Sequence, residues 1–387
     1  MKILHILFWN IVDQVGGTEI YLNNLLEKQK LDNECHVLMP GIGKQYSSDH
    51  VCYYESQFLP IHGDFNFLNG VTIPINFANY KEFIANLNPE IVYFHSFWPK
   101  YFHHLQYLNE LNIQTCIIPH MANFTCLRGD LLQNGEYPCD GKVEITKCYK
   151  CNVNGRLIKK YAPLNFIHRF LGGKYRGYYN IDKAFFRGLS KKFQVVRFVE
   201  VLSLIAQSNT KILPISNWYM KVLEKNGYKV DDTFVNGPND YRYLSKPKPK
   251  HNLNLLFVGR ITKSKGFDVL DNLMDMLDNK RVNLTIVGPV QDEFSSSRLL
   301  SKPNVNYLGT LNRIGVQLQM KNADLLIVPS IAIEMRPLVL LEAIDNNLFP
   351  IGSNIGGIKD IIDEYGGELF DVGDVDALKA TVNSFLK

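Results

Sequence analysis

The segment Leu253–Arg260, LNLLFVGR, is an almost continuous apolar run that ends in glycine and arginine. Two runs of the same kind follow it, VNLTIVGP at Val282–Pro289 and DLLIVPS at Asp324–Ser330. Runs this short and this apolar predict strands that are buried on both faces, as in a parallel sheet. Helical stretches are expected between them, after Gly266 and after Pro337. The alternation of strand and helix therefore predicts an α/β fold.

The first half of the chain repeats this pattern independently. An apolar run, KILHILFW at Lys2–Trp9, precedes an amphipathic stretch at Thr18–Lys30, and the later runs CHVLMP, IVYFHS and IQTCIIPH have the character of buried strands. A chain of 387 residues is too long for one ordinary hydrophobic core. We therefore predict two α/β domains with a cleft between them.

Residues 121–205 interrupt the alternation and are predicted to be an insertion in the first domain. From Arg156 to Val199, basic and aromatic residues are interleaved, and Asp182 is the only acid. This mixture suits an anionic membrane surface, and a solvated basic face over ordinary core aromatics explains it equally well. The net charge of +4 is too mild to imply nucleic acid as a partner, and no RNA-binding signature accompanies the basic stretch.

The sequence offers no clear targeting segment. The apolar run in KILHILFWN is too short for a signal peptide and lacks a small-residue cleavage site, so it is expected to be a buried strand. No stretch approaches the roughly 20 apolar residues of a membrane span. We expect a cytoplasmic protein, with peripheral contact to the inner face of the membrane as the option that the basic stretch raises.

The chain has seven cysteines, which in a cytoplasmic protein are expected to be free or metal-bound and not paired in disulfides. Four lie in the insertion, and the last two form CYKC, in which two intervening residues let both thiolates reach one tetrahedral ion. Structural zinc is the preferred interpretation, and an iron–sulfur cluster and unliganded thiols are the alternatives. The candidate ligands are Cys126, Cys139, Cys148 and Cys151, whereas Cys35, Cys52 and Cys116 are expected to be ordinary buried thiols.

Two cations follow the strand that opens the C-terminal half. In FVGRITKSKGF, the strand ends at Gly259, and the loop carries Arg260 and Lys265 before the next helix. Ligands of open α/β sheets bind beyond the carboxyl ends of the strands, and two cations at this position suit a diphosphate. Taken alone, the pair could equally be two solvated loop residues.

Two acids follow a later strand, in PSIAIEMRPLVLLEA at Pro329–Ala343. Glu334 lies in the loop, and Pro337 is expected at the first helical position, where its missing N–H costs nothing. The helix N-terminus then favours an anionic or hydroxyl-rich ligand close to Glu334. Glu342 lies further along this apolar helix, where a specific partner is the better explanation for a carboxylate.

Together these segments resemble the family 4 glycosyltransferases of the GT-B fold. The motifs are the glycine-rich VGGTEIYLNNLL at Val15–Leu26, R-x4-K at Arg260 and Lys265, and E-x7-E at Glu334 and Glu342. Each is weak alone, but all occur in the expected order and spacing. The resemblance covers nearly the whole chain and implies two Rossmann-like domains facing across a cleft.

The resemblance also implies a domain boundary just after KILPIS. The acceptor-side domain is then residues 1–216 and the nucleotide-sugar-binding domain residues 217–387. The sequence ends in DVDALKATVNSFLK, which is similar to the start of the family's penultimate helix. The final helix that crosses back onto the first domain is therefore expected to be missing from this chain.

For the donor, the resemblance implies a UDP- or GDP-sugar held mainly by the second domain. Arg260 and Lys265 are expected to bind the diphosphate, Glu334 to contact the transferred sugar, and Glu342 to contact the ribose hydroxyls. Leu338 and Val339, at the start of the predicted helix that carries Glu342, are two further expected donor-binding positions.

For the first domain, the resemblance assigns three residues to the site. Gly16 and Gly17 would bring backbone amides near the phosphates and the acceptor, a close approach that glycine permits. His120, after IQTCIIP, matches the family's histidine at the floor of the cleft and would face the reacting sugar carbon. A lone histidine after a strand is more often structural.

The implied reaction is transfer with retention of anomeric configuration, to a lipid-linked or polysaccharide acceptor. Fixed charges from Arg260, Lys265 and Glu334, together with His120, would stabilise an oxocarbenium-like centre and the departing phosphate, so no catalytic metal is expected. The family usually has an aromatic residue after the first acid, where this chain has Met335 and Arg336. The donor sugar is therefore left open.

Two other functions compete with this interpretation. A non-catalytic subunit of the same fold, binding a glycan or a partner enzyme, would explain the expected missing helix and the altered sequence after Glu334. A nicotinamide-dependent oxidoreductase would need a complete glycine fingerprint after the first strand, and PGIGK at Pro40–Lys44 supplies only half of one.

Overall fold

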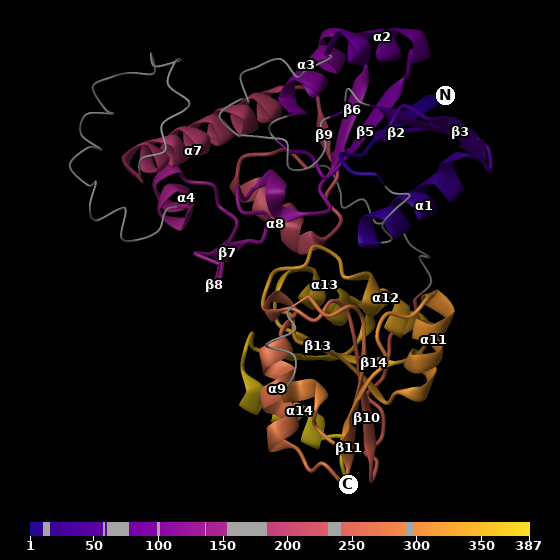
Figure 1. Ribbon diagram of the computed structural model, residues 1–387, viewed down its shortest axis with the longest axis vertical. Helices are drawn as coiled ribbons and strands as arrows, with labels where there is room; N and C mark the ends of the chain where they lie inside the picture. Colours follow the sequence, from indigo (N-terminus) through magenta and orange to yellow (C-terminus); the bar gives the residue numbers. More distant parts are fainter. Residues whose placement is uncertain are drawn as a thin grey trace. The chain divides into compact units, whose positions relative to one another are not determined.

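The computed structural model describes residues 1–10, 16–56, 59, 77–98, 101–135, 137–152, 184–230, 241–291 and 298–387, and of 184–190 the backbone alone. They form two compact units. The first comprises residues 1–215 and 220–236, and the second residues 216–219 and 237–387. Both are shown in Figure 1, and each is described by itself.

The first unit is built on a seven-stranded sheet in the order β3-β4-β2-β1-β5-β6-β9. Every neighbouring pair is parallel except β3 and β4. The apolar runs β1, β2, β5 and β6 occupy its centre, as predicted, and the hairpin of β3 and β4 at the edge was not predicted. The strands are β1 (Lys2–Ile6), β2 (Glu34–Pro40), β3 (Gln45–Ser48), β4 (Val51–Ser56), β5 (Ile91–His95), β6 (Gln114–Ile118) and β9 (Lys211–Ile212).

Helix α1 (Gly17–Gln29) follows β1, in agreement with the amphipathic stretch predicted there. Its apolar side chains pack with β2 around a small core that contains Leu22, Leu26 and Val37. Cys35 and Cys116 are buried as predicted, but Cys52 is only half-buried. It lies on β4, next to the exposed edge strand β3, so that position has less cover than a central strand. The other helices near the sheet are α2 (Phe77–Leu87) and α3 (Phe102–Glu110).

The predicted insertion contains short elements and one long helix. Asn226 anchors its first part: its side chain accepts from the Val143 N–H at 2.8 Å and donates to the Gly141 carbonyl at 3.0 Å. Most of the basic and aromatic stretch falls within 153–183, outside the described residues. The elements are η3 (Ala122–Phe124), β7 (Leu132–Gln133), β8 (Tyr137–Pro138), α4 (Ile145–Asn152) and α7 (Ala184–Gln207), followed by α8 (Asn217–Lys225).

The second unit has a six-stranded sheet in the order β12-β11-β10-β13-β14-β15, and all of its pairs are parallel. The apolar runs at Leu253–Arg260, Val282–Pro289 and Asp324–Ser330 form its strands β10, β11 and β13. The remaining strands lie outside them. The bounds are β10 (Leu253–Val258), β11 (Val282–Val287), β12 (Val305–Tyr307), β13 (Leu325–Val328), β14 (Phe349–Ser353) and β15 (Glu368–Phe370).

Helices cover both faces of this second sheet (Figure 1). Leu255 and Phe257 of β10 point into one core with α9 and α14, and Leu256 points into another with α11, α12 and α13. This double burial explains why the strands are apolar at nearly every position. The prediction of an α/β fold with parallel sheets is confirmed. The helices are η4 (Lys263–Lys265), α9 (Phe267–Met276), α11 (Arg313–Asn322), α12 (Leu338–Asp345), α13 (Gly356–Tyr365) and α14 (Val375–Asn383).

None of the helices that the structure describes combines the length and the hydropathy needed to cross a bilayer.

Candidate functional site

The loop that carries Arg260 is held at the carboxyl ends of β10 and β11. The Gly259 N–H donates to the Val287 carbonyl at 2.9 Å, and a Cβ on Gly288 would lie 2.0 Å from the Gly259 carbonyl oxygen. Glycine is therefore required for this close approach. Arg260 itself is exposed, and it forms no ion pair with any residue that the structure describes. Its guanidinium is available to an anionic ligand.

The same loop is fastened to the loop after β13. Gly266 has φ of 76°, and a Cβ there would lie 1.8 Å from the Pro329 carbonyl oxygen. The backbone N–H groups of Ile331 and Ala332 donate to the Ser264 carbonyl at 2.9 and 3.0 Å. The two loops therefore form one layer beyond the carboxyl ends of adjacent strands β10 and β13.

Lys265 and Glu334 meet across these two loops. Nζ of Lys265 lies 2.6 Å from Oε2 of Glu334, and the Ser330 hydroxyl donates to the other carboxylate oxygen. The side chains are 27% and 17% exposed, so the pair is partly screened from water but still accessible. The structure thus brings together two predicted site residues that are 69 positions apart in the sequence.

The backbone of the Glu334 loop is fixed from a third side. The N–H of Gly357, at the start of α13, donates to the Glu334 carbonyl at 2.8 Å. A Cβ on Gly357 would lie 1.9 Å from the Met335 carbonyl oxygen. Neither Gly357 nor Ser330 was predicted from the sequence to belong to the site. The paired glycines in NIGGIK were a usable signal for Gly357, whereas nothing distinguished Ser330.

Helix α12 begins at Leu338, one residue later than predicted. Pro337 is the capping residue, with ψ of 113°, because the extended loop continues through it. Leu338 and Val339 are half-buried in the first turn. Glu342 is also half-buried, and burial raises its pKa, an effect that the nearby Arg313 opposes. A carboxyl group in this setting can accept hydrogen bonds from ligand hydroxyls.

Arg336 is directed toward aromatic residues of its own unit. It hydrogen-bonds Tyr365, whose pKa is raised to about 12, chiefly by burial and by Glu364. Its charge also acts on Tyr241. These contacts direct the Arg336 side chain to its own unit and give no support for a role in binding a charged sugar.

In the first unit, Gly16 caps α1 and Gly17 begins it. The N–H of Gly16 donates to a carboxylate oxygen of Glu19 at 2.8 Å, and the other oxygen accepts from the Trp9 indole. The Gly16 amide, predicted to approach phosphate, is therefore already occupied by an acid of its own helix.

Two histidines from neighbouring strands, His5 of β1 and His95 of β5, form a hydrogen-bonded chain with His120, which lies just after β6. Nδ1 of His5 lies 3.0 Å from Nε2 of His95, and Nδ1 of His95 lies 2.9 Å from Nε2 of His120. The other nitrogen of His5 lies 2.8 Å from Oε1 of Gln29 on α1. Burial lowers the pKa of His5 to about 4 and that of His120 to about 3, so both are neutral at pH 7.

His95 is fully buried, and burial also lowers its pKa, an effect to which the other two histidines add. Of the three, only His120 was predicted to be functional. The available signal for His5 and His95 was a histidine inside each of two apolar strands, KILHI and IVYFH.

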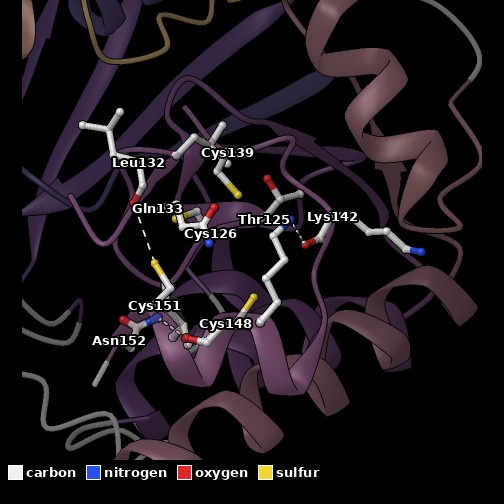
Figure 2. A pocket seen from close by; sticks show the side chains of 12 residues that line it. Thr125, Cys126, Leu132, Gln133, Cys139, Lys142, Cys148, Cys151 and Asn152 are labelled. Atoms are coloured by element: carbon white, nitrogen blue, oxygen red, sulfur yellow. Dashed lines mark hydrogen bonds between the residues drawn. The ribbon is translucent and has the colours of Figure 1, made fainter. Parts of the chain in front are cut away.

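The four cysteines of the insertion line one pocket between the β7–β8 region and α4 (Figure 2). Backbone N–H groups of residues 128, 129 and 131 hydrogen-bond the sulfur of Cys126, although burial raises the pKa of this thiol. Cys151 accepts from the Asn134 N–H at 3.2 Å. Nearby thiols also raise the pKa of Cys148, after the larger effect of burial. The four predicted metal ligands, Cys126, Cys139, Cys148 and Cys151, therefore line the same pocket.

Their present arrangement is not that of a bound ion. Among the described residues, no group of three histidine, cysteine or acidic side chains is placed to hold a metal. The Sγ atom of Cys151 is directed to the Leu132 carbonyl at 3.7 Å. Structural zinc therefore stays a prediction.

The C-terminal part of the chain is similar to known protein families. Residues 245–387 match the family model of glycosyl transferases group 1. The chain is also similar to the sulfoquinovosyl transferase SQD2 of Arabidopsis thaliana, with 32% identity over 137 residues, which are 34% of this chain and 26% of that protein. The matches cover 26% and 31% of two curated relatives, so the chain spans about a quarter to a third of their length.

Solved structures extend the likeness to the whole chain. Anabaena Alr3699/HepE, in complex with UDP and glucose, has a TM-score of 0.57 at 14% identity, over 99% of this chain and 89% of that one. The lipopolysaccharide outer core galactosyltransferase WaaB has a TM-score of 0.58 at 17% identity, over 100% and 90%. At these identities the likeness shows the fold alone. Residues 245–387 are therefore similar to the glycosyl transferases group 1, and the chain as a whole has the GT-B fold.

Proposed function

We propose that the chain is a retaining glycosyltransferase that moves a sugar from a nucleoside-diphosphate donor to a lipid-linked or polysaccharide acceptor. The meeting of Lys265 with Glu334 carries this proposal. A cation for the diphosphate and an acid for the sugar lie side by side in the segment that matches the family model. The relatives support the donor class, because HepE was solved with UDP and glucose.

The proposed roles follow from charge and position. Arg260 is exposed at the end of β10, and with Lys265 it neutralises the charge that develops on the leaving diphosphate. When the donor binds, Lys265 turns from Glu334 to the phosphates, and the freed carboxylate accepts hydroxyls of the sugar. Glu342 accepts the ribose hydroxyls. Two cations supply the positive charge, so the proposed mechanism uses no metal ion at the diphosphate.

His120 belongs to the first unit and is proposed to hold a hydroxyl of the sugar. Its lowered pKa keeps the imidazole neutral, so it can accept a hydrogen bond but does not add a further charge. The proposed retention of configuration is tested by NMR of the anomeric proton in the first product formed.

Calorimetry with a panel of UDP- and GDP-sugars tests the donor proposal. We expect binding by the wild-type chain, and Lys265→Ala should weaken it at least tenfold, because a charge-assisted contact with the diphosphate is lost. Lys246→Ala is the matched control, since Lys246 is an exposed lysine of the same unit, 2.9 Å from Glu368. A full-length protein that binds no donor would instead favour a non-catalytic glycan-binding subunit.

The acceptor proposal rests on two observations. The basic stretch reaches the described helix α7, where Lys191 is exposed and Lys192 is half-buried. One structural relative, WaaB, is a lipopolysaccharide outer core galactosyltransferase. We expect the protein to sediment with anionic liposomes, and charge reversal at Lys191 and Lys192 should reduce that fraction. Sedimentation that the reversal leaves unchanged would contradict membrane contact through this helix.

A further inference from the structure

The histidine chain runs across the sheet toward its carboxyl edge. In the strand register His5 pairs with Tyr93, and His95 pairs with Ile118, two residues before His120. Because side chains alternate along a strand, His5 and His95 lie on the same face of the sheet, and the hydrogen bond to His95 brings His120 to that face. Helix α1 covers this face, since Gln29 contacts His5 and the ring of Tyr21 packs edge-on against His120 at 4.7 Å.

The hydrogen bonds dictate where each proton lies. The carboxamide oxygen of Gln29 lies 2.8 Å from Nε2 of His5, and because an oxygen of this kind can only accept, Nε2 of His5 carries the proton. A neutral imidazole carries one N–H, so Nδ1 of His5 must accept from Nε2–H of His95. By the same rule, Nδ1 of His95 accepts from Nε2–H of His120. The last ring is thereby left with a bare Nδ1.

The two inner rings are buried polar groups, and each of their ring nitrogens has a hydrogen-bond partner. His5 and His95 are 0% exposed, and burying polar groups in a chain is tolerated only when every member is bonded. Next to His95, Ser96 has φ of 60°, a left-handed conformation that is unfavourable for serine. Such strain persists where the surrounding structure enforces it, and it clusters at functional sites.

We propose that His5 and His95 are positioning residues that hold His120 as its Nε2–H tautomer, so that Nδ1 of His120 offers a lone pair to a hydroxyl of the bound sugar. The sugar contact rests on the proposed function, whereas the tautomer is a property of the protein alone. Gln29 sets the direction of the histidine chain, because its carboxamide presents oxygen to His5.

The tautomer can be measured in the full-length protein without substrate. Long-range 1H–15N spectra show which ring nitrogen carries the proton, and we expect a single Nε2–H pattern for His120 at pH 7. His95→Phe keeps a ring of similar size but removes the acceptor, so His120 should show a mixture of both tautomers. His95→Gln offers an amide oxygen in its place and should restore the Nε2–H pattern.

His104→Phe is the matched control. His104 is a fully buried histidine of the same unit, but it lies on α3 and is not part of the hydrogen-bonded chain of histidines. It should leave the His120 spectrum unchanged. A His120 that carries its proton on Nδ1 in the wild type, or a spectrum that His95→Phe does not alter, would overturn the proposal.

Turnover provides the second readout. With one hydrogen bond no longer fixed, His95→Phe should lower kcat about tenfold with little change in KM, and His95→Gln should recover most of that loss. If the wild-type protein shows the Nε2–H pattern for His120 but binds no sugar nucleotide, the proposed function is refuted, while the positioning of His120 by His5 and His95 is supported. An equal loss of kcat in His95→Phe and His95→Gln would overturn the catalytic part of the proposal.

Discussion

The ion pair between Lys265 and Glu334 predicts that one substitution will move donor binding and turnover in opposite directions. Glu334→Gln is isosteric and can still accept from the Ser330 hydroxyl, but it removes the counterion of Lys265. A pair with 27% and 17% exposure is partly screened by solvent, so we assign it about 1 kcal/mol. That energy no longer competes with the phosphates, so UDP should bind roughly fivefold more tightly.

Turnover should fall in the same variant. If the Glu334 carboxylate stabilises the positive charge that develops on the sugar ring, its loss should lower kcat roughly a hundredfold to a thousandfold. Calorimetry with UDP alone measures the first effect, because UDP lacks the sugar that Glu334 is proposed to contact. Steady-state kinetics with the preferred UDP- or GDP-sugar measures the second.

The matched control is Glu368→Gln. Its carboxylate pairs with Lys246 at 2.9 Å in the same unit, with exposures of 47% for the lysine and 37% for the acid. Neither UDP affinity nor kcat should change in this control. If Glu334→Gln weakened UDP binding by the same factor as it lowered kcat, both the competition for Lys265 and the separate role of Glu334 would be refuted.

Three other predictions concern the framework of the site and the insertion. Gly266→Ala should lower Tm and abolish UDP binding, because its Cβ would collide with the Pro329 carbonyl; Gly309→Ala, with a similar φ of 68° and open space around it, should cost only the backbone strain. Equal Tm losses would contradict this steric account. Metal analysis should find one zinc per chain, lost in Cys148→Ser; a purified wild type without metal would rule the site out. Acid should destabilise the fold, because the pKa of His5 is lowered from 6.5 in the unfolded chain to about 4 in the folded protein. Between these two values the unfolded chain binds one more proton than the folded protein, so the free energy of unfolding should fall by about 1.4 kcal/mol for each pH unit that the pH drops from 6.5 to 4. Urea titrations at pH 7 and pH 5 check this, and an unchanged midpoint would contradict it.

Much of the fold could be predicted from local patterns. The apolar runs became central strands because the helices cover both faces of the second sheet, and residues such as Leu255 and Leu256 enter different cores. The hairpin of β3 and β4 was missed, since QYSS is exposed and has no apolar pattern. The start of α12 was placed one residue early, because a proline fits both the cap and the first turn.

The candidate site was predicted in its residues but not in its contacts. The spacing of Arg260, Lys265, Glu334 and Glu342 supported a donor site through family resemblance. The spacing of these residues in the sequence does not indicate that Lys265 pairs with Glu334. It also does not indicate that the Gly16 N–H donates to the Glu19 carboxylate. Ser330 could not be predicted as a site residue, because nothing in the sequence distinguishes one loop serine from another until its neighbours in the fold are known.

The sequence by itself determined which segments become strands and helices, because burial on one or both faces imposes a period on the apolar residues. Only the tertiary structure decided which strands are neighbours. His5 and His95 are 90 positions apart, and they touch because β1 lies beside β5 in the sheet. Likewise β10 lies beside β13, which brings the loops of Lys265 and Glu334 together. Strand order depends on how the whole chain crosses over and packs, and no local pattern encodes it.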